Sequence, residues 1–171
     1  SCDLGLDAVA LIPGANFTYV TGLHFHLMER PTIMFATKAG DVLAIMPELE
    51  RQKWSQCFTD AQTFYWQDSD GFQDAFASAA TALHGKKIGV EGMLMRVFEA
   101  DAMRHHFGAD NILDAQKYLT PLRHVKSPDE IAALQEAIRI SEQALEETLL
   151  SVRAGQAELE ILNILKIRML A

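Results

Sequence analysis

Residues 122–152 read LRHVKSPDEIAALQEAIRISEQALEETLLSV, and this stretch divides the chain into two parts. Ser127 can cap a helix, Pro128 occupies its first position, and Glu130 follows the cap by three residues, which is a capping box. Apolar residues then recur at helical spacings, at Ile131, Leu134, Ile138, Leu145, Leu149 and Val152. The pattern predicts an amphipathic helix of roughly 40 Å, at about 1.5 Å per residue. Because such a helix is longer than a small domain is wide, we expect a strut between two domains.

The composition indicates a globular chain. Its 171 residues are 49% hydrophobic, which is enough for the core of one ordinary domain and leaves further residues outside that domain. The net charge of −8 and the lack of a basic block argue against a nucleic-acid partner. The sequence contains neither an apolar run of about 18 residues nor a basic-then-apolar leader, so we expect no membrane span and a cytoplasmic location. Cys2 and Cys57 form no CxxC or zinc-like spacing and are expected to be reduced thiols.

The part before residue 115 alternates short apolar runs with amphipathic stretches. Strands are expected over 7–12, 32–37, 42–46, 61–66, 87–91 and 111–114, and helices over 17–21, 47–57, 72–83 and 94–107. Asn16 is the expected cap of the first helix, and Gly22 its end. A four-residue loop between the second and third runs predicts a hairpin. We therefore predict an α/β fold, with a mixed sheet of about five or six strands flanked by helices.

Residues 156–171, QAELEILNILKIRMLA, carry apolar side chains around nearly the whole circumference of a helix. Such a helix belongs inside a core or between subunits. We expect that the core of a second domain has been truncated; the alternative is a terminal helix that docks in an oligomer interface. The expected organisation is a domain over 1–121, a joint over 122–126, and a long helix with the start of a second domain over 127–171.

The chain lacks the spacing signatures of common catalytic sites. Its six histidines are His24, His26, His84, His105, His106 and His124, and none forms an HExxH or related pattern. We expect the rings of His24 and His26 to point to opposite sides of an extended segment, so a metal site within the chain is not expected. No GxSxG elbow occurs, and residues 89–92, GVEG, lack the glycines of a dinucleotide loop.

Residues 24–31, HFHLMERP, form the one polar cluster that suggests a site. Arg30 offers a rigid fork that suits a carboxylate, either of a substrate terminus or of Glu29 in a neighbouring chain. The alternative is a local salt bridge that fixes the loop before the strand at Thr32. His24, Glu29 and Arg30 are therefore the candidate residues for contact with substrate or with a partner subunit.

Five short segments resemble, in order, those of the creatinase/prolidase N-terminal domain family. They are NFTYVTG at 16–22, ERP at 29–31, PELE at 47–50, IGVE at 88–91 and LRHVKSPDEI at 122–131. Each segment is short, but their order over most of the chain makes the resemblance specific. Residues 155–169, including Glu158, also resemble the start of the pita-bread domain that follows in this family.

The resemblance implies the non-catalytic N-terminal domain of an Xaa-Pro aminopeptidase or Xaa-Pro dipeptidase. Two divalent metal ions, of manganese, cobalt or zinc, would be held by the pita-bread domain beyond the long helix, so this chain alone is expected to hold no metal and to be inactive. The implied partners are its own C-terminal catalytic domain, a second copy in a homodimer, and proline-containing peptides. In some members the domain lends residues to the partner subunit's cleft, and His24, Glu29 and Arg30 are the candidates here.

Two alternatives remain open on the sequence. The same domain could precede a creatinase-type amidinohydrolase, or it could belong to a metal-free pita-bread protein that binds partners. The sequence of the catalytic domain would separate them, because the enzymes need two Asp, one His and two Glu as metal ligands.

Overall fold

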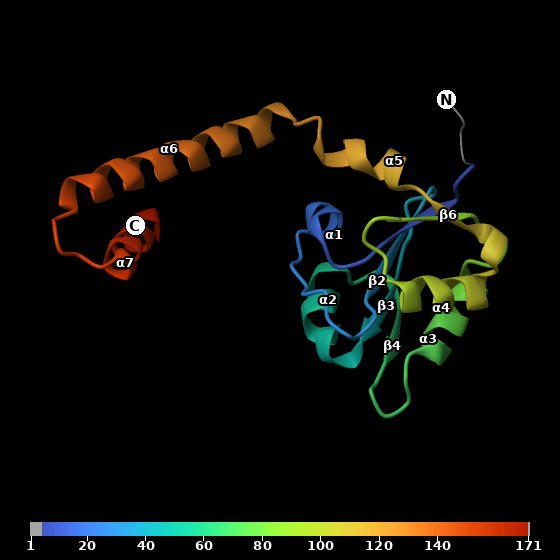
Figure 1. The fold of residues 1–171 in the computed structure, drawn as a ribbon. Coiled ribbons are helices and arrows are strands. Elements are labelled where there is room, and N and C mark those ends of the chain that lie inside the picture. Colours follow the sequence, from blue (N-terminus) through green and yellow to red (C-terminus); the bar gives the residue numbers. More distant parts are fainter. Residues whose placement is uncertain (1–4, 171) are drawn as a thin grey trace. The chain divides into compact units, whose positions relative to one another are not determined.

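The computed structural model describes residues 5–170, and Cys2 lies outside this range. The chain forms two compact units, Ser1–His124 and Val125–Ala171, drawn in Figure 1. The division between the units falls within the expected joint, 122–126.

The described residues of the first unit form a six-stranded mixed sheet, as predicted. The strands are β1 (Ala8–Leu11), β2 (Ile33–Thr37), β3 (Val42–Pro47), β4 (Gln62–Trp66), β5 (Ile88–Val90) and β6 (Ile112–Asp114), in the spatial order β4-β3-β2-β1-β5-β6. β2 pairs antiparallel with both of its neighbours, and every other described pair is parallel. The carboxyl ends of the remaining five strands therefore lie at one edge of the sheet.

Helices cover both faces of this sheet (Figure 1). α3 (Gln73–Ala82) and α4 (Val97–Phe107) cover one face, while α1 (Ala15–Thr21), α2 (Arg51–Cys57) and α5 (Gln116–Leu119) lie on the other. Successive side chains of a strand point to opposite faces, so Ala10 and Ile33 pack toward α3 and α4, while Leu11 and Met34 pack toward α1 and α2. The described residues of the unit also include three 3-10 helices: η1 (Glu48–Glu50), η2 (Ala109–Asn111) and η3 (Thr120–Arg123).

Three details differ from the sequence-based expectation. The helix expected over 47–57 begins only at Arg51, because Pro47 ends β3 and Glu48–Glu50 form the 3-10 helix η1. Asn16 does not cap α1, because it lies inside the first turn, and the cap position is Gly14. The residues between β6 and the joint, for which no element was predicted, form α5 and η3. Gly22 ends α1 as predicted, with a left-handed φ of 70° that a residue without Cβ adopts at little cost.

The second unit consists of α6 (Pro128–Ser151) and α7 (Glu158–Leu170). The predicted capping box is present, since the Glu130 amide donates to Ser127 Oγ at 3.2 Å and the Ser127 amide donates to Glu130 Oε2 at 2.7 Å. Large apolar side chains on both helices are exposed, among them Leu150 at 79% and Leu170 at 89%. Within residues 5–170, none of the helices combines the length and the apolar character needed to cross a bilayer.

Candidate functional site

The predicted polar cluster, residues 24–31, lies at the carboxyl edge of the sheet. The segment leads into β2, whose first residue, Ile33, pairs with Ile45 near the end of β3. Arg30 and Pro47 line two cavities there, of about 340 and 130 Å³. Ligands of open α/β sheets usually bind outside the carboxyl ends of the strands, so this edge is where a binding site is expected in the unit.

Arg30 forms an ion-pair network in which Asp68 is the main partner. Its Nε and Nη2 donate to the Asp68 carboxylate at 2.9 and 2.5 Å, and its Nη1 donates to Glu29 Oε1 at 2.8 Å. The hydrogen bonds from Arg30 lower the pKa of Asp68, and the same bonds raise the pKa of Arg30. The local salt bridge considered above is therefore present, but it also joins the loop to the residues after β4.

The rings of His24 and His26 contact each other edge to face, with centroids 5.2 Å apart. The expectation that they point to opposite sides is wrong, because residues two apart on an extended chain share a face. The intervening Phe25 and the preceding Leu23 are buried, so both imidazoles are exposed. The loop thus presents two adjacent imidazoles, beside the exposed carboxylate of Glu29.

The part of the chain that the structure describes contains no group of three or more His, Cys, Asp or Glu side chains placed to hold a metal ion. His24 and His26 form only a pair, while two-metal hydrolytic centres need several converging ligands. The residues present at this edge therefore do not fit the two divalent ions that the resemblance implies for the catalytic domain.

A buried polar network joins three of the family-like segments at the same edge. Glu91, only 2% exposed, accepts hydrogen bonds from the Ile12 amide at 3.2 Å and from Asn16 Nδ2 at 2.9 Å. Asn16 Oδ1 accepts from Arg123 Nε at 2.8 Å. Burial raises the pKa of Glu91, while the two hydrogen bonds and the charge of Arg123 act in the opposite direction. The network ties the end of β5 to α1 and to η3, which leads into the joint.

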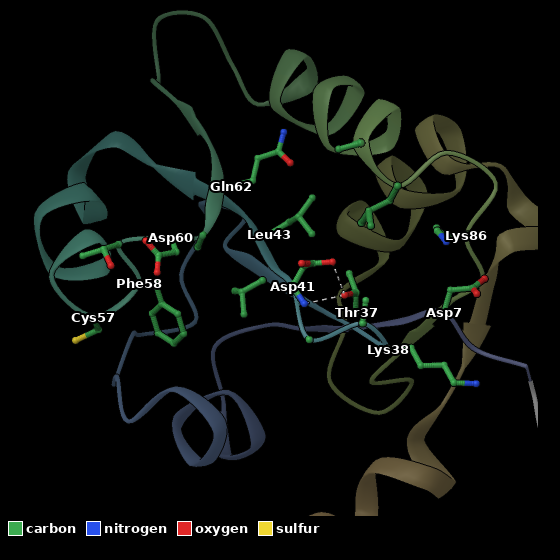
Figure 2. A pocket seen from close by; sticks show the side chains of 17 residues that line it. Asp7, Thr37, Lys38, Asp41, Leu43, Cys57, Phe58, Asp60, Gln62 and Lys86 are labelled. Atoms are coloured by element: carbon green, nitrogen blue, oxygen red, sulfur yellow. Dashed lines mark hydrogen bonds between the residues drawn. The ribbon is translucent and has the colours of Figure 1, made fainter.

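A wider depression of about 910 Å³ lies at the opposite edge of the sheet, beside the turn between β2 and β3 (Figure 2). The Asp41 amide donates to Thr37 Oγ1 at 3.0 Å within this turn. In Figure 2, Cys57, which is an exposed free thiol, lies on one side of the depression, and Lys38 and Lys86 lie on the other. Ligand pockets usually have a few convergent polar groups, and these side chains do not converge, so we assign no site here.

These features define a class of protein, an α/β domain with a mixed sheet. A polar loop and a buried polar network lie at the carboxyl edge of the sheet, and the network holds η3, after which the chain continues into the long helix α6. The model of the creatinase/prolidase N-terminal domain family matches residues 2–125. The chain therefore belongs to this family, as its sequence segments indicated.

The chain is also similar to longer proteins of known structure. It superimposes on a prolidase from Thermococcus sibiricus with a TM-score of 0.78 and 23% identity, over 96% of this chain and 45% of that one. It superimposes on an X-Pro aminopeptidase from Thermotoga maritima with a TM-score of 0.76 and 24% identity, over 96% of this chain and 46% of that one. A candidate dipeptidase of Bacillus subtilis, YkvY, is 21% identical over 164 residues, covering 94% of this chain and 45% of that protein. The chain thus spans less than half the length of the curated relatives it matches.

Proposed function

We propose that the chain is the N-terminal, non-catalytic domain of a proline-specific metallopeptidase, an Xaa-Pro dipeptidase or aminopeptidase. Family membership over residues 2–125 is the observation that carries this proposal. Structures named prolidase and X-Pro aminopeptidase share the fold, and their names point to cleavage beside proline. In this proposal the two divalent metal ions and their ligands belong to a catalytic domain outside residues 5–170, which contain no ligand set of their own.

The proposed role of the domain is to shape access to the active-site cleft and to support a homodimer. The loop 24–31 supports it, because Arg30 lines both carboxyl-edge cavities and the exposed His24 lines the smaller one, while the exposed Glu29 is bonded to Arg30. These side chains would face a proline-containing peptide or the cleft of the partner subunit. The exposed apolar side chains of α6 and α7 would pack against the remainder of the catalytic domain, whose start these helices would form, since exposed apolar patches mark interaction surfaces.

Arg30→Ala, in the peptidase that contains this chain, is expected to raise KM about tenfold with little change in kcat. The reason is that Arg30, through its bonds to Asp68 and Glu29, fixes the loop that lines the proposed cleft. A substrate contact that depends on this loop is shared by ground and transition states, and about 1.4 kcal/mol of such binding corresponds to tenfold. Arg139→Ala is the matched control, because Arg139 also makes a two-point ion pair, with Glu136 at 2.9 and 2.7 Å, but on α6. Steady-state kinetics that give the same KM for Arg30→Ala and Arg139→Ala would remove Arg30 from the substrate site.

The proposed function is tested on the longer protein that contains this sequence. It is assayed with manganese on an Xaa-Pro dipeptide, an Xaa-Pro-initiated tripeptide and creatine. Cleavage of either peptide supports the proposal and separates dipeptidase from aminopeptidase. Cleavage of creatine alone would establish the amidinohydrolase alternative, and a protein that neither binds metal nor hydrolyses any of the three would be the metal-free binding protein.

A further inference from the structure

The loop 24–31 contains no helix or strand, yet two cations from different helices hold its backbone. Lys53 Nζ, on α2, donates a hydrogen bond to the His24 carbonyl. Arg96 Nη1, at the start of α4, donates to the Met28 carbonyl. Both bonds are made to backbone atoms, so they constrain the path of the loop without engaging the exposed side chains of His24 and His26.

Two further contacts fix the far end of the same loop to β4. Trp66 Nε1 donates to the Pro31 carbonyl at 3.2 Å in a buried position. Arg30, as described above, forms a two-point bond with Asp68 just after the strand. The loop is therefore attached at four points, which indicates a fixed rather than a mobile conformation.

Arg96 is itself held in one orientation by a buried carboxylate. Its Nε and Nη2 donate to Glu99 at 3.1 and 2.5 Å, and its own amide donates to Glu99 Oε2 at 3.2 Å. The side chain of Glu99 is 0% exposed, and the guanidinium also lies over the Phe98 ring at 4.6 Å from the centroid. Because these contacts occupy one edge and one face of the guanidinium, Nη1 is directed toward Met28.

We propose that Arg96 is a positioning residue for the loop 24–31: anchored on Glu99, it fixes the Met28 carbonyl and thereby the side on which His24 and His26 are presented. Lys53 has the same role at the other end of the loop. The proposal concerns the conformation of this chain alone, so it does not depend on which reaction the whole protein performs.

Arg96→Lys separates positioning from stability. A lysine keeps a positive charge beside Glu99, but its single ammonium lacks the planar fork that reaches both the carboxylate and the Met28 carbonyl. We expect the backbone order parameters of residues 26–29, measured by nitrogen-15 relaxation, to fall from about 0.85 to about 0.6 or lower. Chymotryptic cleavage after Leu27 should become about tenfold faster, which corresponds to the loss of one net hydrogen bond.

Two variants serve as comparisons on the same chain. Arg104→Lys changes an exposed arginine of the same helix, whose partner Asp101 lies 3.8 Å away, and should leave the loop order unchanged. Lys53→Met should loosen the end of the loop nearest His24 and shift the imidazole signals of both histidines. Order parameters in β2 serve as the reference for the fold.

The proposal predicts high order in the wild-type loop and a loss in Arg96→Lys that is confined to the loop. Unchanged loop order in Arg96→Lys would overturn it. An equal loss of order in the loop and in β2 would also overturn it, since Arg96 would then act only on the stability of the whole unit.

Discussion

Glu91→Ala is expected to lower the free energy of unfolding of the first unit by about 3 kcal/mol at pH 7. The substitution leaves two buried donors, the Ile12 amide and the Asn16 side chain, without their acceptor, and each unsatisfied group costs about 1–3 kcal/mol. Urea unfolding followed by tryptophan fluorescence measures the change. Asp101→Ala is the control: Asp101 is an exposed carboxylate on α4, and its loss should cost less than about 0.5 kcal/mol. Equal stability of the two variants would show that the network contributes nothing.

The contribution of Glu91 should also depend on pH in a defined direction. Burial raises its pKa, so the folded chain binds this proton more tightly than the unfolded chain does. The tighter binding of this proton stabilises the folded chain fully below the ordinary glutamate pKa of about 4.3. This stabilisation is lost as the pH rises through the raised pKa of Glu91 in the folded chain. The stability difference between wild type and Glu91→Ala should therefore narrow from about pH 4 toward pH 7. A difference that widens over this range would contradict the assignment.

Arg96→Met is expected to cost about 3–5 kcal/mol, because it removes the partner of a fully buried carboxylate. Methionine retains length and apolar contact, so the loss reports mainly on the charge left at Glu99. The same urea experiment measures it, with Arg104→Met as an exposed control on the same helix that should change stability by less than about 0.5 kcal/mol.

A double variant, Arg96→Met with Glu99→Met, identifies the cause of this loss. Replacing both members of a buried ion pair by apolar residues is often nearly neutral, so the double variant should recover most of the stability lost in the single one. A double variant that is no more stable than Arg96→Met would show that packing, and not an unpaired charge, causes the loss.

Local patterns in the sequence predicted most helices and strands, but they did not predict which strands pair with each other. The capping box at Ser127 and Glu130 and the helical spacing after it fixed the start of α6, because both are short-range features. The strand order depends on crossovers such as the parallel pairing of Ala8 with Ile88, which no local pattern encodes. The sheet was therefore predicted in class and strand number but not in order.

Asn16 shows why the buried network was missed. Asparagine before an apolar run favours a helix cap, and this local rule decided the prediction. Its actual partners, Glu91 and Arg123, lie 75 and 107 residues away in the sequence. Only the fold brings them together, so the capping rule was overridden by tertiary hydrogen bonds.

The loop 24–31 was found from its composition, but its supports were not. Asp68 lies in the connection between the strand expected over 61–66 and the helix expected over 72–83, where no functional residue was predicted. Arg96 was not identified either, although its i,i+3 spacing to Glu99 is a common ion-pair pattern. The contact between His24 and His26 could have been predicted. Alternation with the buried Leu23 and Phe25 places both rings on one face.

The central claim is that this domain supports a proline-specific peptidase whose chemistry lies outside it. The most direct test is the release of proline from an Xaa-Pro dipeptide by the purified 171-residue chain with added manganese, beside the longer protein under the same conditions. We predict that the longer protein releases proline. The 171-residue chain is expected to release no more proline than a control that contains manganese and no protein. Saturable release in proportion to the concentration of the chain alone would contradict it.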